Sequence, residues 1–186
     1  MHEPKISFIS FPGTIHLIDS DQKLLQVSSL LKESRKLGFD TETRPSFKVG
    51  EIYKVALLQL ATDNDAFLIR LHFIKEFQIL KDIFEDESVV KVGLAIRDDL
   101  KLLRKTFSFE PKNFIELQTI AKEKKLKNLG LKGMTEEVLD AHLTKGPKLT
   151  NWELQALTDR QLMYAATDAW IGLKLFERLQ IEIKPA

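Results

Sequence analysis

Cysteine is absent from the 186 residues, so disulfide bonds, cysteine-bound zinc and thiol nucleophiles are all excluded. This absence fits a reducing compartment, and we expect a cytoplasmic protein. No apolar run approaches the ~20 residues of a membrane-spanning helix, so no membrane association is expected. The N-terminal stretch MHEPKISFIS has no apolar segment followed by a small-residue cleavage site, which argues against a signal peptide. The formal net charge is only +1, so any basic surface must be local.

Internal repeats, low-complexity tracts and linkers rich in proline, glycine or serine are also missing from the sequence. What remains is 44% apolar and 30% charged, a composition that suits one globular domain with a substantial core. We therefore expect a single domain over residues 1–186.

Hydrophobic periodicity predicts antiparallel strands in the first part of the chain and alternating strands and helices after them. We predict strands over residues 14–19, 36–42, 55–62, 66–71, 88–94 and 113–118. We predict helices over residues 20–34, 74–86, 97–107 and 158–180, with short helical pieces within 118–143 and a helical turn at 151–156. Antiparallel strands followed by strand–helix alternation favour an α/β fold with a mixed sheet and helices on both faces.

The stretch FDTET (39–43) places two acids inside a predicted strand. At a period of two residues, Asp40 and Glu42 point to the same face with their Cα atoms ~6.5–7 Å apart. At an effective dielectric constant near 20 the two charges repel by ~2.5 kcal/mol. Either this end of the strand is solvated or paired with Arg44, or a hard divalent cation lies between the carboxylates.

The C-terminal helix carries a further acid beside a tyrosine. Tyr164 and Asp168 are four residues apart, so they lie on one helical stripe together with Ile171 and Leu175. An aspartate on a mostly apolar stripe needs a partner, which is either an ordinary ion pair or a metal ion.

Two more acids open the helix predicted at 97–107. Asp98 and Asp99 suit the first turn of a helix because negative charge is favourable at the N-terminal end of the helix dipole. Both border the apolar stripe that contains Leu102 and Leu103. Helical spacing alone does not separate the two aspartates.

These three segments, in this order, resemble the three sequence blocks of the DEDD 3′–5′ exonucleases. FDTET resembles the first block, and KVGLAIRDD resembles the second, in which an aspartate stands six residues after a glycine, here Asp99. YAATDA resembles the third block of the tyrosine subgroup, whereas Met163 stands where the histidine subgroup has its histidine. The resemblance covers residues 14–180 and is greatest to the branch with ribonuclease D and the Werner syndrome protein exonuclease domain.

The resemblance implies a ribonuclease H-like fold with a mixed sheet of five to six strands. It implies two divalent cations, Mg²⁺ or Mn²⁺, and a catalytic set of Asp40, Glu42, Asp99, Tyr164 and Asp168. The four carboxylates would be the metal ligands, with Asp40, Glu42 and Asp168 on one ion and Asp40 and Asp99 on the other. Tyr164 would orient the attacking water.

Substrate contacts are expected from local features near the predicted cleft. The candidates are Thr41, Phe47, Lys148 and Asn151. Phe47 either stacks on a terminal base or packs within a loop. The basic run at 122–128, with Lys132 and Lys145 beyond it, either holds phosphates or forms a solvated helix face.

The resemblance thus implies a metal-dependent 3′–5′ exonuclease that releases 5′-mononucleotides. Its partner would be nucleic acid, as a single strand or the 3′ end of a duplex, and the sequence leaves DNA or RNA open. Repair of DNA and processing of RNA are both compatible roles. The alternative is a non-catalytic nucleic-acid-binding module on the same fold, but such a module would be expected to lack one or more of the acids, and all four are present.

Overall fold

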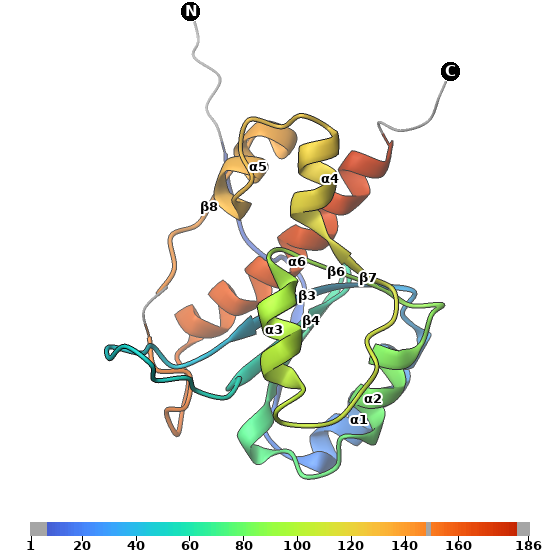
Figure 1. Ribbon diagram of the computed structural model, residues 1–186, viewed down its shortest axis with the longest axis vertical. Helices are drawn as coiled ribbons and strands as arrows, with labels where there is room; N and C mark the ends of the chain where they lie inside the picture. The colour runs from blue at the N-terminus through green and yellow to red at the C-terminus, as the bar shows by residue number, and fades with distance from the viewer. Residues whose placement is uncertain (1–6, 148–149, 182–186) are drawn as a thin grey trace, which may run out of the picture.

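A six-stranded mixed sheet forms the centre of the computed structural model, which describes residues 7–147 and 150–181 (Figure 1). The strands are, in spatial order, β2 (Thr14–Ile18), β5 (Asp65–Arg70), β4 (Leu57–Ala61), β3 (Lys36–Glu42), β6 (Val90–Gly93) and β7 (Phe114–Glu116). The β5–β4 and β4–β3 pairs are antiparallel, whereas the β2–β5, β3–β6 and β6–β7 pairs are parallel. The predicted mixed α/β sheet is therefore confirmed.

Helices cover both faces of this sheet. They are α1 (Asp21–Glu33), the 3₁₀ turn η1 (Leu71–Phe73), α2 (Gln78–Glu85), α3 (Ile96–Leu103), α4 (Leu117–Glu123), α5 (Leu131–Leu139) and α6 (Asp159–Ile181). One apolar cluster joins α1, α2 and α3 to one face of the central strands. A second cluster joins α6 to the other face, and a third packs α4 and α5 against the C-terminal half of α6 (Figure 1).

The alternation of β3 decides which of its side chains reach which layer. Leu37 and Phe39 belong to the cluster with α1 and α2. Gly38 lies against α6, where an added Cβ would come within 1.9 Å of the carbonyl oxygen of Ala169. Because side chains alternate along a strand, Asp40 and Glu42 share the face of Gly38 and point toward the layer of α6.

Several local predictions need correction. The predicted helix at 74–86 begins only at Gln78, after η1 and an irregular segment. The helical turn predicted at 151–156 is wrong, since this segment contains only turns and bends. A small parallel sheet of β1 (Ser7–Ile9) and β8 (Ala141–Leu143) was not predicted at all. Within the described residues, no helix is long and apolar enough to cross a membrane.

Candidate metal centre

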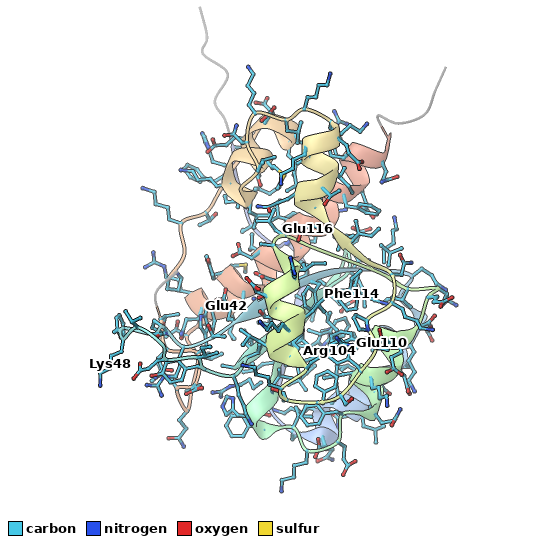
Figure 2. The ribbon with its side chains drawn as sticks, viewed as in Figure 1. Glu42, Lys48, Arg104, Glu110, Phe114 and Glu116 are labelled. Carbon is cyan, nitrogen blue, oxygen red and sulfur yellow. The ribbon has the colours of Figure 1, made fainter. Side chains whose placement is uncertain are left out.

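Strand β3 brings two carboxylates to the middle of the sheet. In β4 the antiparallel neighbours of Asp40 and Glu42 are Gln59 and Leu57, and β6 flanks the other side of β3. β3 is thus an interior strand of the sheet. Glu42 ends the strand in the region between α3 and α6 (Figure 2).

Helix α6 adds the third carboxylate. Asp40, Glu42 and Asp168 each offer an oxygen, and these oxygens all lie within 4.8 Å of one another. The helix approaches β3 closely because Gly38 has no side chain at the point of contact with Ala169. Residues 128 positions apart in sequence therefore form one acidic cluster.

Asp99 reaches this centre from the first turn of α3. Its carboxylate accepts a 2.7 Å hydrogen bond from the hydroxyl of Thr41, the residue between the two acids of β3. It is not among the three mutually adjacent carboxylates, but its charge acts on the pKa of both Asp40 and Glu42. Asp98 is exposed to solvent, so the geometry favours Asp99 as the member of the pair that faces the centre.

The start of α3 is held by a residue that sequence reasoning missed. Glu116, at the end of β7, accepts hydrogen bonds of 2.8 Å from the backbone N–H groups of both Ala95 and Ile96. Ala95 adopts a left-handed conformation with φ of 55°, and this tight turn between β6 and α3 sets the orientation of Asp99. Figure 2 shows Glu116 beside this end of α3.

Burial and neighbouring negative charges raise the pKa of Asp40, Glu42 and Asp99. Burial, followed by the charges of Glu42, Asp168 and Asp99, holds the pKa of Asp40 well above its usual range. Burial and the charges of Asp168 and Asp99 raise the pKa of Glu42 to about 8. Burial is also the main reason that the pKa of Asp99 is raised to about 6. Such a set is costly to ionise unless a cation compensates its charge.

Tyr164 lies one turn before Asp168 on α6. Burial, the charges of Asp168 and Glu42, and a hydrogen bond to Asp168 raise the pKa of its phenol. The phenol therefore remains protonated at neutral pH, and its one O–H is donated to Asp168. The ring of Trp152 stacks on that of Tyr164, with centroids 6.2 Å apart and an interplanar angle of 25°.

A cavity of about 740 Å³ opens beside the cluster. Tyr164 and Asp168 line one part of it, and the N-terminal end of α5, strand β8 and the loop after β8 line the rest. Lys132 and Lys145 contribute the positive charge of this lining. Both lysines belong to the basic positions that the sequence indicated as phosphate contacts.

The four candidates for substrate contact are dispersed. Thr41 lies within the centre, bonded to Asp99. Phe47 is 85% exposed in the loop between β3 and β4, so it does not pack within the protein. The side chain of Asn151 accepts a hydrogen bond from the backbone N–H of Glu153, which shapes the turn before α6. Lys148 lies outside the described residues.

Comparison with known proteins identifies the family. The sequence profile of the 3′–5′ exonuclease family matches residues 15–184. The chain belongs to the 3′–5′ exonuclease family. The expected enzyme class, a 3′–5′ exonuclease, and the resemblance to the DEDD superfamily are confirmed by this match.

Individual members of the exonuclease family agree with this assignment. The chain is 33% identical over 187 residues to the mouse bifunctional 3′–5′ exonuclease/ATP-dependent helicase WRN, covering 95% of this chain and 13% of that protein. Its fold matches the Nibbler EXO domain of Aedes aegypti with a TM-score of 0.84 at 23% identity, over 94% of this chain and 92% of that one. Escherichia coli RNase D gives a TM-score of 0.80 at 27% identity, over 91% and 45%. The chain spans 13–60% of the first four curated relatives.

The acidic centre fits a divalent metal, which membership of the family also implies. The available donors are carboxylate oxygens, the ligands that hard cations such as Mg²⁺ and Mn²⁺ prefer. Three of them already converge within bridging distance of one ion. The groups that shift the pKa of Asp40 and Glu42 include neighbouring carboxylates and no lysine or arginine.

Proposed function

We propose that this protein hydrolyses phosphodiester bonds from the 3′ end of a nucleic acid and releases 5′-mononucleotides. The observation that carries the proposal is the convergence of Asp40, Glu42 and Asp168 within 4.8 Å, with Tyr164 on the next turn of α6. We further propose that one domain, spanning residues 1–186, contains all the groups required, and the predicted cytoplasmic location stays a prediction.

The metal ligands are assigned in two groups. Asp40, Glu42 and Asp168 would hold one ion, and Asp40 together with Asp99 would hold a second, with Asp99 oriented by the Thr41 hydroxyl. When bound, a pair of Mg²⁺ or Mn²⁺ ions lowers the pKa of a water molecule and stabilises the charge of the in-line displacement. The carboxylates must bind in their ionised form, so metal binding releases the protons that their raised pKa values retain.

Tyr164 acts in its protonated form and not as a base. Its raised pKa excludes a phenolate at neutral pH, and because its one O–H is donated to Asp168, the phenol oxygen orients the attacking water by accepting a hydrogen bond from it. The hydrogen bond to Asp168 keeps this hydroxyl at the edge of the acidic cluster.

The substrate is assigned to the cavity next to Tyr164 and Asp168. Lys132 and Lys145 are placed to contact backbone phosphates, and this type of contact binds DNA and RNA without reading sequence. Asn151, in the turn before α6, and Lys148, which lies outside the described residues, are proposed as further contacts. Phe47, exposed on the loop that carries Lys48 at its outer end, is proposed to stack on a base (Figure 2).

A 5′-labelled single strand incubated with Mn²⁺ or Mg²⁺ tests the activity. Wild-type protein should give a ladder of products shortened from the 3′ end, and Asp40→Asn should give none. Because asparagine has the shape of aspartate without its charge, the variant should retain its fold. Equal degradation by both proteins would reject the proposal. Oligonucleotide binding without turnover under either ion would instead support the non-catalytic binding module.

A further inference from the structure

Trp152 combines full burial with an unused hydrogen-bond donor. Its side chain is 1% exposed, and its indole nitrogen Nε1 is buried without a hydrogen-bond partner of acceptable geometry. Native structures rarely leave a buried donor unpaired, and each such case calls for an explanation. A core position that needed only apolar bulk could hold phenylalanine, which fills much of the same space as tryptophan and has no hydrogen-bond donor.

The surroundings of Trp152 connect it to the metal centre from two sides. Its ring stacks on Tyr164, as described above. The next residue, Glu153, forms a 3.4 Å ion pair with Arg44, which follows Glu42 by two positions. The indole N–H also lies close enough to the Glu42 carboxylate to lower its pKa, opposing the larger effect of burial.

The turn that carries Trp152 is fixed although it is neither helix nor strand. Arg70, 2% exposed at the end of β5, donates hydrogen bonds to the backbone carbonyls of Leu154 and Gln155. On the preceding side, the Thr150 hydroxyl accepts a 2.8 Å hydrogen bond from the side-chain amide of Gln161 in α6. These bonds tie both ends of the turn to the sheet and to α6, so the indole is held in place beside Glu42.

We propose that Trp152 is a positioning residue whose indole N–H donates a hydrogen bond to the Glu42 carboxylate and orients that carboxylate toward the bound divalent ion. This inference rests on the proposed metal site. Hydrogen bonds to the outer oxygen of a ligating carboxylate fix its orientation and raise metal affinity. Glu42 then accounts for the buried indole donor that has no other partner.

The chain supplies its own control, because it contains two tryptophans. Trp170 is 6% exposed, its Nε1 is also buried without a partner, and it packs on Phe11 away from the acids. Trp152→Phe and Trp170→Phe therefore make the same chemical change in similarly buried sites. Calorimetric titration with Mn²⁺ should show a 10- to 100-fold weaker affinity for Trp152→Phe and an unchanged affinity for Trp170→Phe.

A second measurement does not depend on turnover or on the Trp152 variant. Trp170→Phe leaves Trp152 as the source of the single indole N–H signal in a ¹⁵N–¹H spectrum. Saturation with Mg²⁺ should move this signal downfield, as expected for a new hydrogen bond to a carboxylate, and the shift should be lost in Trp170→Phe/Glu42→Gln. An unmoved signal, or unchanged Mn²⁺ affinity of Trp152→Phe, would overturn the inference.

The same data separate this inference from the proposed function. If wild-type protein binds Mn²⁺ with the expected dependence on Trp152 but degrades no oligonucleotide, the positioning role stands and the proposed activity fails. If oligonucleotides are degraded while Trp152→Phe binds Mn²⁺ like wild type and keeps its kcat, the activity stands and the positioning role fails.

Discussion

At the scale of single residues, two adjacent aspartates have opposite surroundings. Asp99 is half-buried and bonded to Thr41, whereas Asp98 is exposed. We expect Asp99→Asn to lower kcat by at least about 100-fold, since loss of a ligand should exceed the 10- to 100-fold cost of losing an outer-shell partner. Asp98→Asn is the matched control and should stay within about twofold. Single-turnover assays decide, and similar losses in both variants would contradict the assignment.

Tyr164 permits a separate prediction about pH. Because the pKa of its phenol is raised above the ordinary value of ~10, the hydroxyl should remain a donor throughout the range of a normal assay. Tyr164→Phe should therefore lower kcat by about 10- to 100-fold. The factor should be the same at pH 7 and at pH 9, and the affinity for Mn²⁺ should be unchanged. A loss that grows or shrinks between these pH values would indicate that the phenol titrates.

Sequence patterns located Asp40, Glu42 and Asp168 because each conflicts with its local environment, whereas Asp99 suits the start of a helix and was chosen by the resemblance to the second sequence block. Two same-face charges on an apolar strand are costly without compensation, and so is an aspartate on an apolar helical stripe. Trp152 and Glu116 carry no such conflict, since a tryptophan is usual in a core and an acid is usual at a strand end. The role of Trp152 is shown only by its contacts with Glu42 and Tyr164. The role of Glu116 is shown only by its hydrogen bond to the turn at Ala95.

At the scale of elements, the packing of α6 on β3 sets the separation of the carboxylates. Gly38→Ala would place a Cβ 1.9 Å from the Ala169 carbonyl oxygen, so the helix must move away from the strand that carries Asp40. We expect a loss of about 1–3 kcal/mol in the free energy of unfolding and weaker Mn²⁺ binding. Urea unfolding measures the first quantity and calorimetric titration the second.

The control for this prediction is Gly172→Ala on the same helix. The nearest atom to its added Cβ is the Val92 carbonyl oxygen at 3.8 Å, an ordinary contact distance. Alanine at an interior helical position should then stabilise the protein by up to about 1 kcal/mol. Equal unfolding midpoints for the two variants would show that α6 does not pack closely against Gly38.

Elements with a clear period were predicted, and those decided by distant contacts were not. The segment before α2 stays irregular because Asp21, in the first turn of α1, accepts hydrogen bonds from the backbone N–H groups of Lys75 and Glu76. The turn at 151–156 is not helical, because the Arg70 side chain donates hydrogen bonds to two of its backbone carbonyls. The strands of the β1–β8 pair have three residues each, too few to show alternation.

At the scale of the whole molecule, metal and pH should act on stability together. The pKa of Glu42 is raised to about 8 and that of Asp40 is raised well above its usual range, so both acids bind protons more tightly in the folded protein than in the unfolded chain. Without metal, the contribution of these two groups to stability should be complete below the ordinary carboxyl pKa of ~4 and should be lost as the pH rises toward 8. Binding of a divalent cation favours the ionised carboxylates and should reverse this loss.

We therefore expect the Tm of the metal-free protein to be at least about 5 °C lower at pH 8 than at pH 6, which corresponds to a loss of roughly 2 kcal/mol for a domain of this size. Millimolar Mn²⁺ should raise the Tm at pH 8 by more than at pH 6. Glu42→Gln removes one of the titrating groups, so its metal-free Tm should depend less on pH and respond less to Mn²⁺. Scanning calorimetry of wild type and Glu42→Gln at the two pH values, in chelator and in Mn²⁺, measures these Tm values. A wild-type Tm that is unaffected by Mn²⁺ at pH 8 would mean that Asp40 and Glu42 are stable as a solvated strand end and hold no metal.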